Sequence, residues 1–112
     1  MEPHLKTAQA HRFLAIGYLS LSIFIVAPLW VVSRTSNGID LSRIIFAETV
    51  VLTAGCIFVA LHLVVAFGAK RKKSWARTMT NLIGVVMLFA FPIGTVIGGY
   101  LIWTGAEKWG DV

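Results

Sequence analysis

The sequence predicts an all-α integral membrane protein, organised as a single domain over residues 1–112, with three transmembrane helices. Composition is the first observation: 57% of the 112 residues are hydrophobic, 13% are charged, and the mean hydropathy is +0.80. Soluble domains have about 45–50% apolar and about 25% charged residues. The second observation is that apolar residues gather in three runs, at about 13–33, 46–69 and 79–104. The third is a short basic segment between the last two runs.

The first run, Phe13 to Ser33, contains no formally charged residue. Its length matches the roughly 20 residues that cross about 30 Å of hydrocarbon. A cleavable signal peptide has a shorter apolar region, about 7–15 residues, followed by small residues. This run is longer and ends in "PLWVVSR", so we expect a retained span that Pro28 kinks near its outer end.

The second run follows a turn signal at Asn37-Gly38, and Asp40 or Ser42 is expected to cap its helix. Glu48 lies near its start, at the expected membrane interface. Cys56 is the only cysteine, so an internal disulfide and a CxxC site are both excluded.

The third run contains "FPIGTVIGGYLIW" and extends from Thr78 to Gly105, which is 28 residues. A helix of that length is about 42 Å long, and two full spans would need roughly 40 residues. We therefore predict one helix, kinked at Pro92, whose ring clashes with the carbonyl of Leu88. Thr95 or a neighbouring helix is expected to help satisfy the freed group. The alternative is a re-entrant hairpin buried in protein.

Small residues recur every four positions in this run, at Ala90, Gly94 and Gly98, and therefore share one helix face. Such a face lets another helix approach closely, and packing contacts then hold the two together in lipid. We predict a helix-packing interface here. Its partner, either a helix of this chain or another protein, is left open by the sequence.

Five basic residues make up the segment between the second and third runs: Lys70, Arg71, Lys72, Lys73 and Arg77. We expect this segment to be a cytoplasmic loop, because such loops carry an excess of lysine and arginine. The N-terminus then also lies in the cytoplasm. A nucleic-acid-binding patch is disfavoured because the segment is short and isolated. Trp75, Tyr100 and Trp103 flank the third run and are predicted interfacial anchors.

His62 is the candidate cofactor ligand, because an ionisable side chain inside a span suggests function by default. A neutral imidazole can ligate haem iron or (bacterio)chlorophyll magnesium. The opposing interpretation is a histidine that hydrogen-bonds a neighbouring helix. His62 lies eight residues before Lys70, about 12 Å inside the membrane edge, whereas His11 is expected at the edge itself. Pairing of the two on one haem therefore fits poorly.

Three segments, "PHLKTAQAHRFLAIGYLSL", "LHLVVAFGAKRKKSWAR" and "FPIGTVIGGYLIW", resemble a group of small, mostly uncharacterised bacterial multi-pass membrane proteins. Their pattern is a histidine-containing apolar segment, a basic turn with Trp-Ala-Arg, and a glycine-rich span with Phe-Pro-Ile-Gly-Thr that ends near Tyr-x-x-Trp. His62, Trp75 to Arg77, Phe91 to Thr95 and Tyr100 fall on this pattern. The resemblance implies a bacterial cytoplasmic (inner) membrane protein. It implies no activity.

The sequence contains no catalytic motif and no metal-ligand motif, so we expect no enzyme and no metal site. The leading hypothesis is a small non-catalytic protein of the lipid bilayer that docks through its small-residue face. It would serve as an accessory or structural subunit of a larger complex, or associate with itself. One alternative is a haem- or (bacterio)chlorophyll-binding subunit that uses His62. A further alternative is a small channel, holin or transporter.

Overall fold

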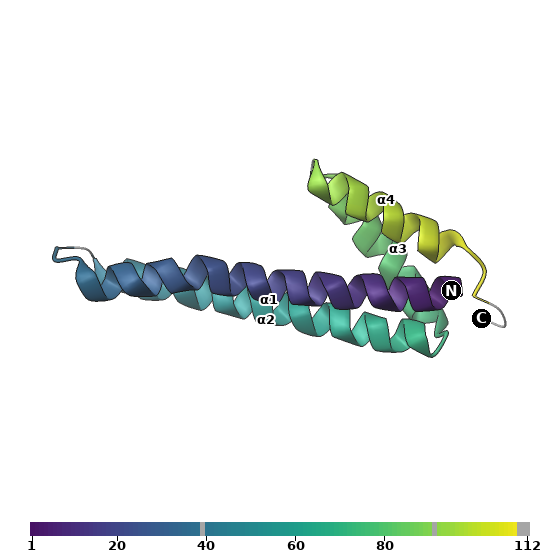
Figure 1. Ribbon diagram of the computed structural model, residues 1–112, viewed down its shortest axis with the longest axis horizontal. Coiled ribbons are helices and arrows are strands. Elements are labelled where there is room, and N and C mark those ends of the chain that lie inside the picture. Colours follow the sequence, from purple (N-terminus) through teal and green to yellow (C-terminus); the bar gives the residue numbers. More distant parts are fainter. Residues whose placement is uncertain (39, 91, 110–112) are drawn as a thin grey trace. The chain divides into compact units, whose positions relative to one another are not determined.

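The computed structural model describes residues 1–38, 40–90 and 92–109. In these residues the chain is all-helical, as predicted, with helices α1 (Pro3–Thr35), α2 (Leu41–Lys70), α3 (Ser74–Leu88) and α4 (Ile93–Ala106) (Figure 1). The chain divides into two compact units, one formed by Met1–Phe13 and His62–Val112 and the other by Leu14–Leu61.

Helices α1 and α2 contain 33 and 30 residues and are both long and apolar enough to cross a membrane. The predicted spans 13–33 and 46–69 lie inside them. In their most apolar stretches only 6% and 22% of the residues are buried. A core helix of a soluble protein would be mostly buried, so these two helices instead carry their apolar side chains on the outside.

In the unit Leu14–Leu61, α1 and α2 approach each other at small residues. Ser22 faces Gly55, and a Cβ atom added to Gly55 would lie 3.1 Å from the Ser22 Cβ and closer still to its hydroxyl. One turn away, the rings of Tyr18 and Phe58 stack at 5.1 Å. The Ser22 hydroxyl donates to the carbonyl of Tyr18 at 2.8 Å, so this polar group is satisfied within its own helix.

The turn between α1 and α2 fixes the start of α2. Gly38 has a φ of +88°, which glycine adopts readily, so the Asn37-Gly38 signal marked a true turn. Asp40 then caps α2, because its carboxylate accepts from the backbone N–H of Ser42 at 3.1 Å and from the Ser42 hydroxyl at 2.5 Å. These bonds hold the pKa of Asp40 below its ordinary value. Of the two capping candidates, Asp40 is the one used.

The basic turn between α2 and α3 is shorter than predicted. Helix α2 ends at Lys70 and α3 begins at Ser74, with Lys72 in a left-handed conformation at a φ of 55°. Arg77 was assigned to this loop, and that assignment is wrong because Arg77 lies in α3. Its guanidinium donates to the carbonyl oxygens of Gly105 at 2.6 Å and Ala106 at 3.0 Å, which are backbone acceptors at the end of α4.

The third apolar run is a helical hairpin, so the prediction of one kinked helix is wrong. Three contacts show that α3 and α4 run antiparallel: Arg77 bonds Gly105, Gly84 faces Gly98, and Thr95 bonds Leu88. The two residues of a pair are fewer positions apart in sequence when the pair lies nearer the break between the helices, as in an antiparallel hairpin. Figure 1 shows α3 and α4 side by side. The chain path is that of the predicted alternative.

Pro92 begins the second arm instead of bending a single helix. It occupies the N-cap position of α4, where its missing N–H costs no helical hydrogen bond. The Thr95 hydroxyl donates to the Leu88 carbonyl at 3.0 Å, which confirms the predicted role of Thr95. The arms contain 15 and 14 residues, and each is therefore about 21–23 Å long. Phe91, part of the Phe-Pro-Ile-Gly-Thr sequence, lies outside the described residues.

The predicted small-residue face is used inside this hairpin. A Cβ atom on Gly98 would lie 2.5 Å from the Gly84 carbonyl oxygen and 2.9 Å from the Leu88 nitrogen. Gly94 is buried against the carbonyl of Met87, whereas Ala90 is exposed. The sequence left the partner of this face open, and for Gly98 that partner is α3 of the same chain.

The hairpin predicts opposite effects for two adjacent glycines. Gly98→Ala adds a methyl group against the α3 backbone, which cannot yield, and should lower the free energy of unfolding by about 1–3 kcal/mol. Gly99→Ala meets nothing within 4 Å and should raise it by up to about 1 kcal/mol, because alanine favours helices. Circular dichroism during SDS titration in detergent measures both. Equal effects of the two substitutions would contradict the packing of Gly98 on Gly84.

Candidate functional site

The candidate site lies where three helix segments of the unit Met1–Phe13 and His62–Val112 meet. Each segment presents a buried face of small or polar residues at helical spacing. The α1 face is His4, Thr7, Ala8 and His11; the α2 face is His62, Val65, Ala66 and Ala69; the α3 face is Ala76, Thr80 and Gly84. Small side chains let the helices approach closely, and the polar ones then come within hydrogen-bonding distance of one another.

Two histidines and a threonine form a continuous buried hydrogen-bond chain at this junction. His11 Nδ1 lies 2.8 Å from His62 Nδ1, and His11 Nε2 lies 2.9 Å from Thr80 Oγ1. The three residues are 0%, 1% and 0% exposed. The two imidazole rings have centroids 5.0 Å apart and are tilted by 31°. One imidazole, that of His11, therefore connects α1 to both α2 and α3.

The chain of bonds fixes which nitrogen carries each proton when both rings are neutral. The Thr80 hydroxyl donates to the Ala76 carbonyl at 2.8 Å, so its oxygen accepts from His11 Nε2–H. A neutral imidazole has one donor and one acceptor, and His11 Nδ1 is therefore the acceptor. His62 Nδ1 must then be the donor, which makes His62 Nε2 the nitrogen with the lone pair.

The expectation that His11 and His62 lie at different depths is wrong. It assumed that the first helix begins at Phe13, where the apolar run begins. Helix α1 begins at Pro3 instead, so His11 lies eight residues inside it. His62 lies eight residues before the end of α2 at Lys70. Each histidine is therefore about 12 Å from the end of its helix, which brings the two rings to the same level.

The geometry limits how the pair can hold a metal. Imidazole nitrogens bind metals such as zinc at about 2.0–2.1 Å, so two nitrogens on opposite sides of an ion are about 4 Å apart. At 2.8 Å the two Nδ1 atoms hydrogen-bond each other instead. In this tautomer His62 Nε2 is the nitrogen that carries the lone pair. Among the described residues, no three His, Cys, Asp or Glu side chains are grouped to hold a metal ion.

Charged and aromatic side chains near the N-terminus also form contacts within this unit. Glu2 lies 3.2 Å from His4 Nδ1 and 3.6 Å from Lys72 Nζ, which brings the N-terminus beside the basic turn. The Lys6 ammonium lies 5.2 Å from the centre of the Trp103 ring, a cation–π contact between α1 and α4.

The predicted anchors are partly exposed: Trp75 is 43% exposed, Tyr100 41% and Trp103 53%. Trp75 also covers Gly68, since a Cβ atom there would lie 2.5 Å from its ring. Trp109, by contrast, is 1% exposed, and its Nε1–H donates to the Thr104 carbonyl at 3.0 Å. It is therefore a buried side chain.

Sequence reasoning found His62 but missed its two partners. The depth argument excluded His11, and Thr80 was not among the predicted site residues. The available signal was periodicity, because Ala76, Thr80 and Gly84 repeat every four residues, as Ala90, Gly94 and Gly98 do. Searches of known protein families, of curated proteins and of solved structures found no match for this chain.

The hydrogen-bond chain predicts opposite tautomers for the two histidines. ¹⁵N NMR of the protein in detergent at neutral pH should show His11 protonated at Nε2 and His62 protonated at Nδ1. Thr80→Val should remove the acceptor and release the fixed tautomer of His11, whereas Thr80→Ser should preserve it. The reverse assignment, or identical spectra for the Val and Ser variants, would contradict the bonding order.

Proposed function

We propose that this protein is a small non-catalytic subunit of a bacterial inner-membrane complex, with α1 and α2 crossing the bilayer and α3–α4 inserted as a re-entrant hairpin. The observation that carries the proposal is the distribution of side chains. Large apolar residues are exposed, whereas the buried positions are mostly small or polar. Lipid as the solvent explains both halves of this pattern, because it solvates apolar surface and leaves polar groups to pair with one another.

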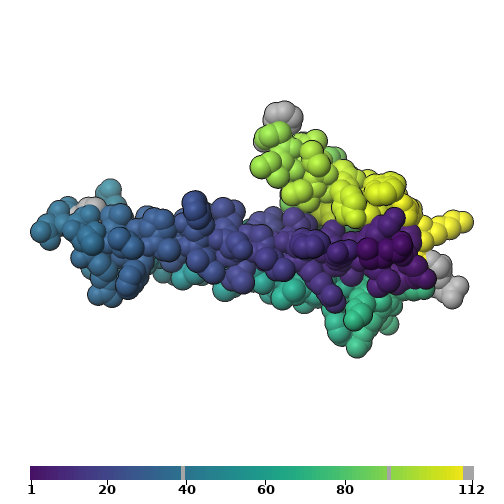
Figure 2. Space-filling model, viewed as in Figure 1, coloured from purple at the N-terminus to yellow at the C-terminus, as the bar shows by residue number. Residues whose placement is uncertain are grey.

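Exposed large apolar side chains occur on each of the four helices. In water, large contiguous apolar patches are rare on monomers. The positions with at least half of their surface exposed include Phe13, Ile16, Leu19, Phe24, Trp30, Phe46, Ile57, Val64, Phe67, Leu82, Val86, Phe89, Ile93 and Val96. Figure 2 shows α4, in light green and yellow, forming part of the surface. A bilayer, or a neighbouring membrane subunit, accommodates such a surface without the cost of hydrating it.

The hairpin is proposed to be re-entrant because its arms are short. Each arm is about 21–23 Å long, and the hydrocarbon core is about 30 Å thick. Irregular backbone at membrane depth must be satisfied within protein. The Thr95 bond to the Leu88 carbonyl does this on one side of the break. Phe89 and Ile93, which flank the break, are 87% and 73% exposed and suit an apolar environment.

The proposed orientation places the N-terminus and the basic turn together in the cytoplasm. The contact of Glu2 with Lys72 supports a shared side for these two segments. The basic residues from Lys70 to Lys73 then supply the excess of positive charge that is expected in cytoplasmic loops. The turn between α1 and α2 faces the opposite side of the membrane.

The subunit role is proposed to use the outer face of the hairpin. Gly98 packs against α3, so this position of the predicted small-residue face is already occupied within the chain. Val86 and Val96 are 70% and 74% exposed, one on each arm. They offer a neighbouring protein an apolar surface that the chain's own packing leaves uncovered.

A native gel with mass spectrometry of the band tests this role. In mild detergent the tagged protein should migrate in a band larger than the monomer and co-purify with a defined partner. Val96→Trp should reduce that co-purification severalfold. Phe24→Trp, at a 77% exposed position of α1, serves as the matched control and should leave it unchanged. Migration only as a lone monomer in every mild detergent would refute the subunit role.

A second candidate, a haem- or (bacterio)chlorophyll-binding subunit, is favoured by the tautomer of His62. Histidines that bind metals commonly donate their other ring N–H to a neighbouring acceptor, and His11 Nδ1 is such an acceptor. This role predicts a visible absorption band in the purified protein, which His62→Gln removes. A colourless and fully assembled preparation would eliminate it.

A further inference from the structure

A cavity of about 370 Å³ lies at the end of the unit Leu14–Leu61, beside the turn between α1 and α2. Three of its lining residues come from the end of α1 and three from the start of α2. They are Trp30, Ser33, Arg34, Leu41, Ile45 and Glu48. Small-molecule sites occupy about 300–1,000 Å³, so this cavity is large enough for a lipid headgroup but too small for a whole lipid.

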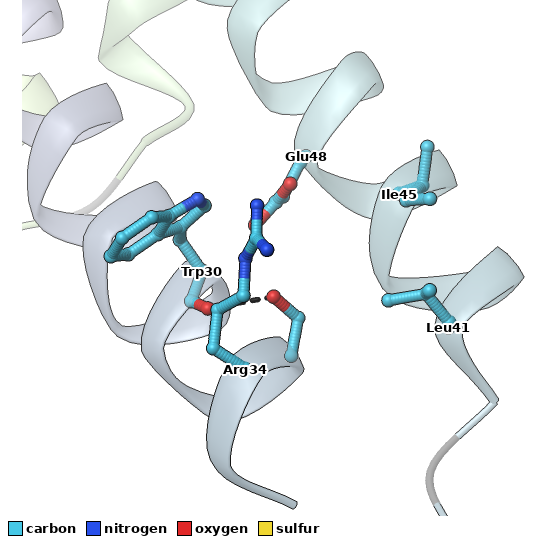
Figure 3. Close-up of a pocket in the computed structure, with 6 residues that line it drawn as sticks. Trp30, Arg34, Leu41, Ile45 and Glu48 are labelled. Atoms are coloured by element: carbon cyan, nitrogen blue, oxygen red, sulfur yellow. Dashed lines mark hydrogen bonds between the residues drawn. The ribbon is translucent and has the colours of Figure 1, made fainter.

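Two opposite charges line this cavity without pairing with each other. Among the described residues, Arg34 and Glu48 form no ion pair within 4.0 Å. The Oε1 atom of Glu48 is buried and has no hydrogen-bond partner there. Figure 3 shows the Arg34 side chain between Trp30 and Glu48. A buried carboxylate oxygen without a donor is costly, so a ligand that supplies one would stabilise this arrangement.

The arginine is held in place by its neighbour. Its guanidinium carbon lies 5.5 Å from the centre of the Trp30 ring, a cation–π contact that orients the planar group. Guanidinium groups bind phosphate oxygens with two parallel hydrogen bonds. The Ser33 hydroxyl proton is unavailable to an anion, because it is donated to the Trp30 carbonyl at 2.6 Å. The cavity therefore offers one anion-binding group and one cation-binding group.

We propose that this cavity binds a zwitterion with a primary ammonium and a phosphate, the chemistry of an ethanolamine phospholipid headgroup. The phosphate pairs with Arg34 and the ammonium donates to Glu48. A primary ammonium has N–H donors for the buried carboxylate oxygen, whereas a choline group has none. Leu41 and Ile45 are about half exposed and supply an apolar wall beside the headgroup. The inference that this zwitterion is a lipid headgroup rests on the proposed crossing of the bilayer by α1 and α2. Binding of a zwitterion of this chemistry does not depend on that crossing.

Native mass spectrometry of the full chain in detergent tests the proposal with three lipids of identical acyl chains. Phosphatidylethanolamine should bind at least about tenfold more tightly than phosphatidylglycerol, which has no cation, and more tightly than phosphatidylcholine. Glu48→Gln should abolish the preference over phosphatidylglycerol. Arg34→Gln should weaken binding of all three lipids, and the milder Arg34→Lys should weaken it less.

Two matched variants control for the loss of charge. Arg43→Gln removes a positive charge near the same turn, and Glu107→Gln removes a negative charge elsewhere; neither residue lines the cavity. Both should bind as the parent protein does. Equal affinity for the three lipids, or parental selectivity in Glu48→Gln, would overturn the proposal.

Soluble phosphoethanolamine distinguishes the two sources of the headgroup. If millimolar phosphoethanolamine displaces the lipid, the cavity recognises the headgroup alone and admits a soluble zwitterion. If it fails to displace a lipid that binds selectively, the acyl chains contribute and the source is the bilayer. Either result supports the site. Neither depends on the native-gel result, so the subunit role and the cavity can fail independently.

Discussion

The architecture depends on one constraint: polar groups inside an apolar exterior must satisfy one another. The chain meets it with hydrogen bonds between helices that are far apart in sequence. His11, His62 and Thr80 form the central example, since a single imidazole links α1, α2 and α3. Loss of one member would leave a buried donor or acceptor unpaired, which costs about 1–3 kcal/mol. The junction is therefore specific as well as close-packed.

The same constraint explains the hairpin. Two helix ends and a chain reversal leave backbone groups without helical partners. The guanidinium of Arg77 covers the carbonyl groups of Gly105 and Ala106, and Thr95 covers that of Leu88. Glycines then allow close approach, with Gly84 against Gly98. Polar satisfaction and small side chains act together, because a bulky residue at the seam would separate the bonding groups.

Much of this fold could be read from the sequence, and the failures have physical causes. Composition and run length identified α1 and α2, because apolar length is a direct consequence of helix rise. Length misled for the third run, since 28 residues suit one tilted or kinked span, whereas a hairpin of the same length has arms too short to cross the hydrocarbon core. The depth of His11 was misjudged because α1 extends beyond its apolar run to Pro3. Tertiary pairings such as Thr80 with His11 leave little trace in a single sequence.

The candidate site, like the fold, was predictable only in part. His62 was predictable as a polar residue inside an apolar helix, and the structure adds His11 as its partner. The cavity between Arg34 and Glu48 was not predictable, because its residues come from both sides of a turn. The two features have different proposed roles. The histidine junction holds helices together, and the cavity is proposed to bind a ligand.

The distance between the start of α3 and the end of α4 tests the hairpin most directly. Spin labels at Thr78→Cys and Ala106→Cys, in a Cys56→Ser background, can be measured by double electron–electron resonance in detergent and in bilayers. Both labelled positions are exposed. The hairpin predicts a short distance, under about 20 Å, because Arg77 bonds the Ala106 carbonyl. A distance near 40 Å, the length of about 28 residues in one helix, would contradict it.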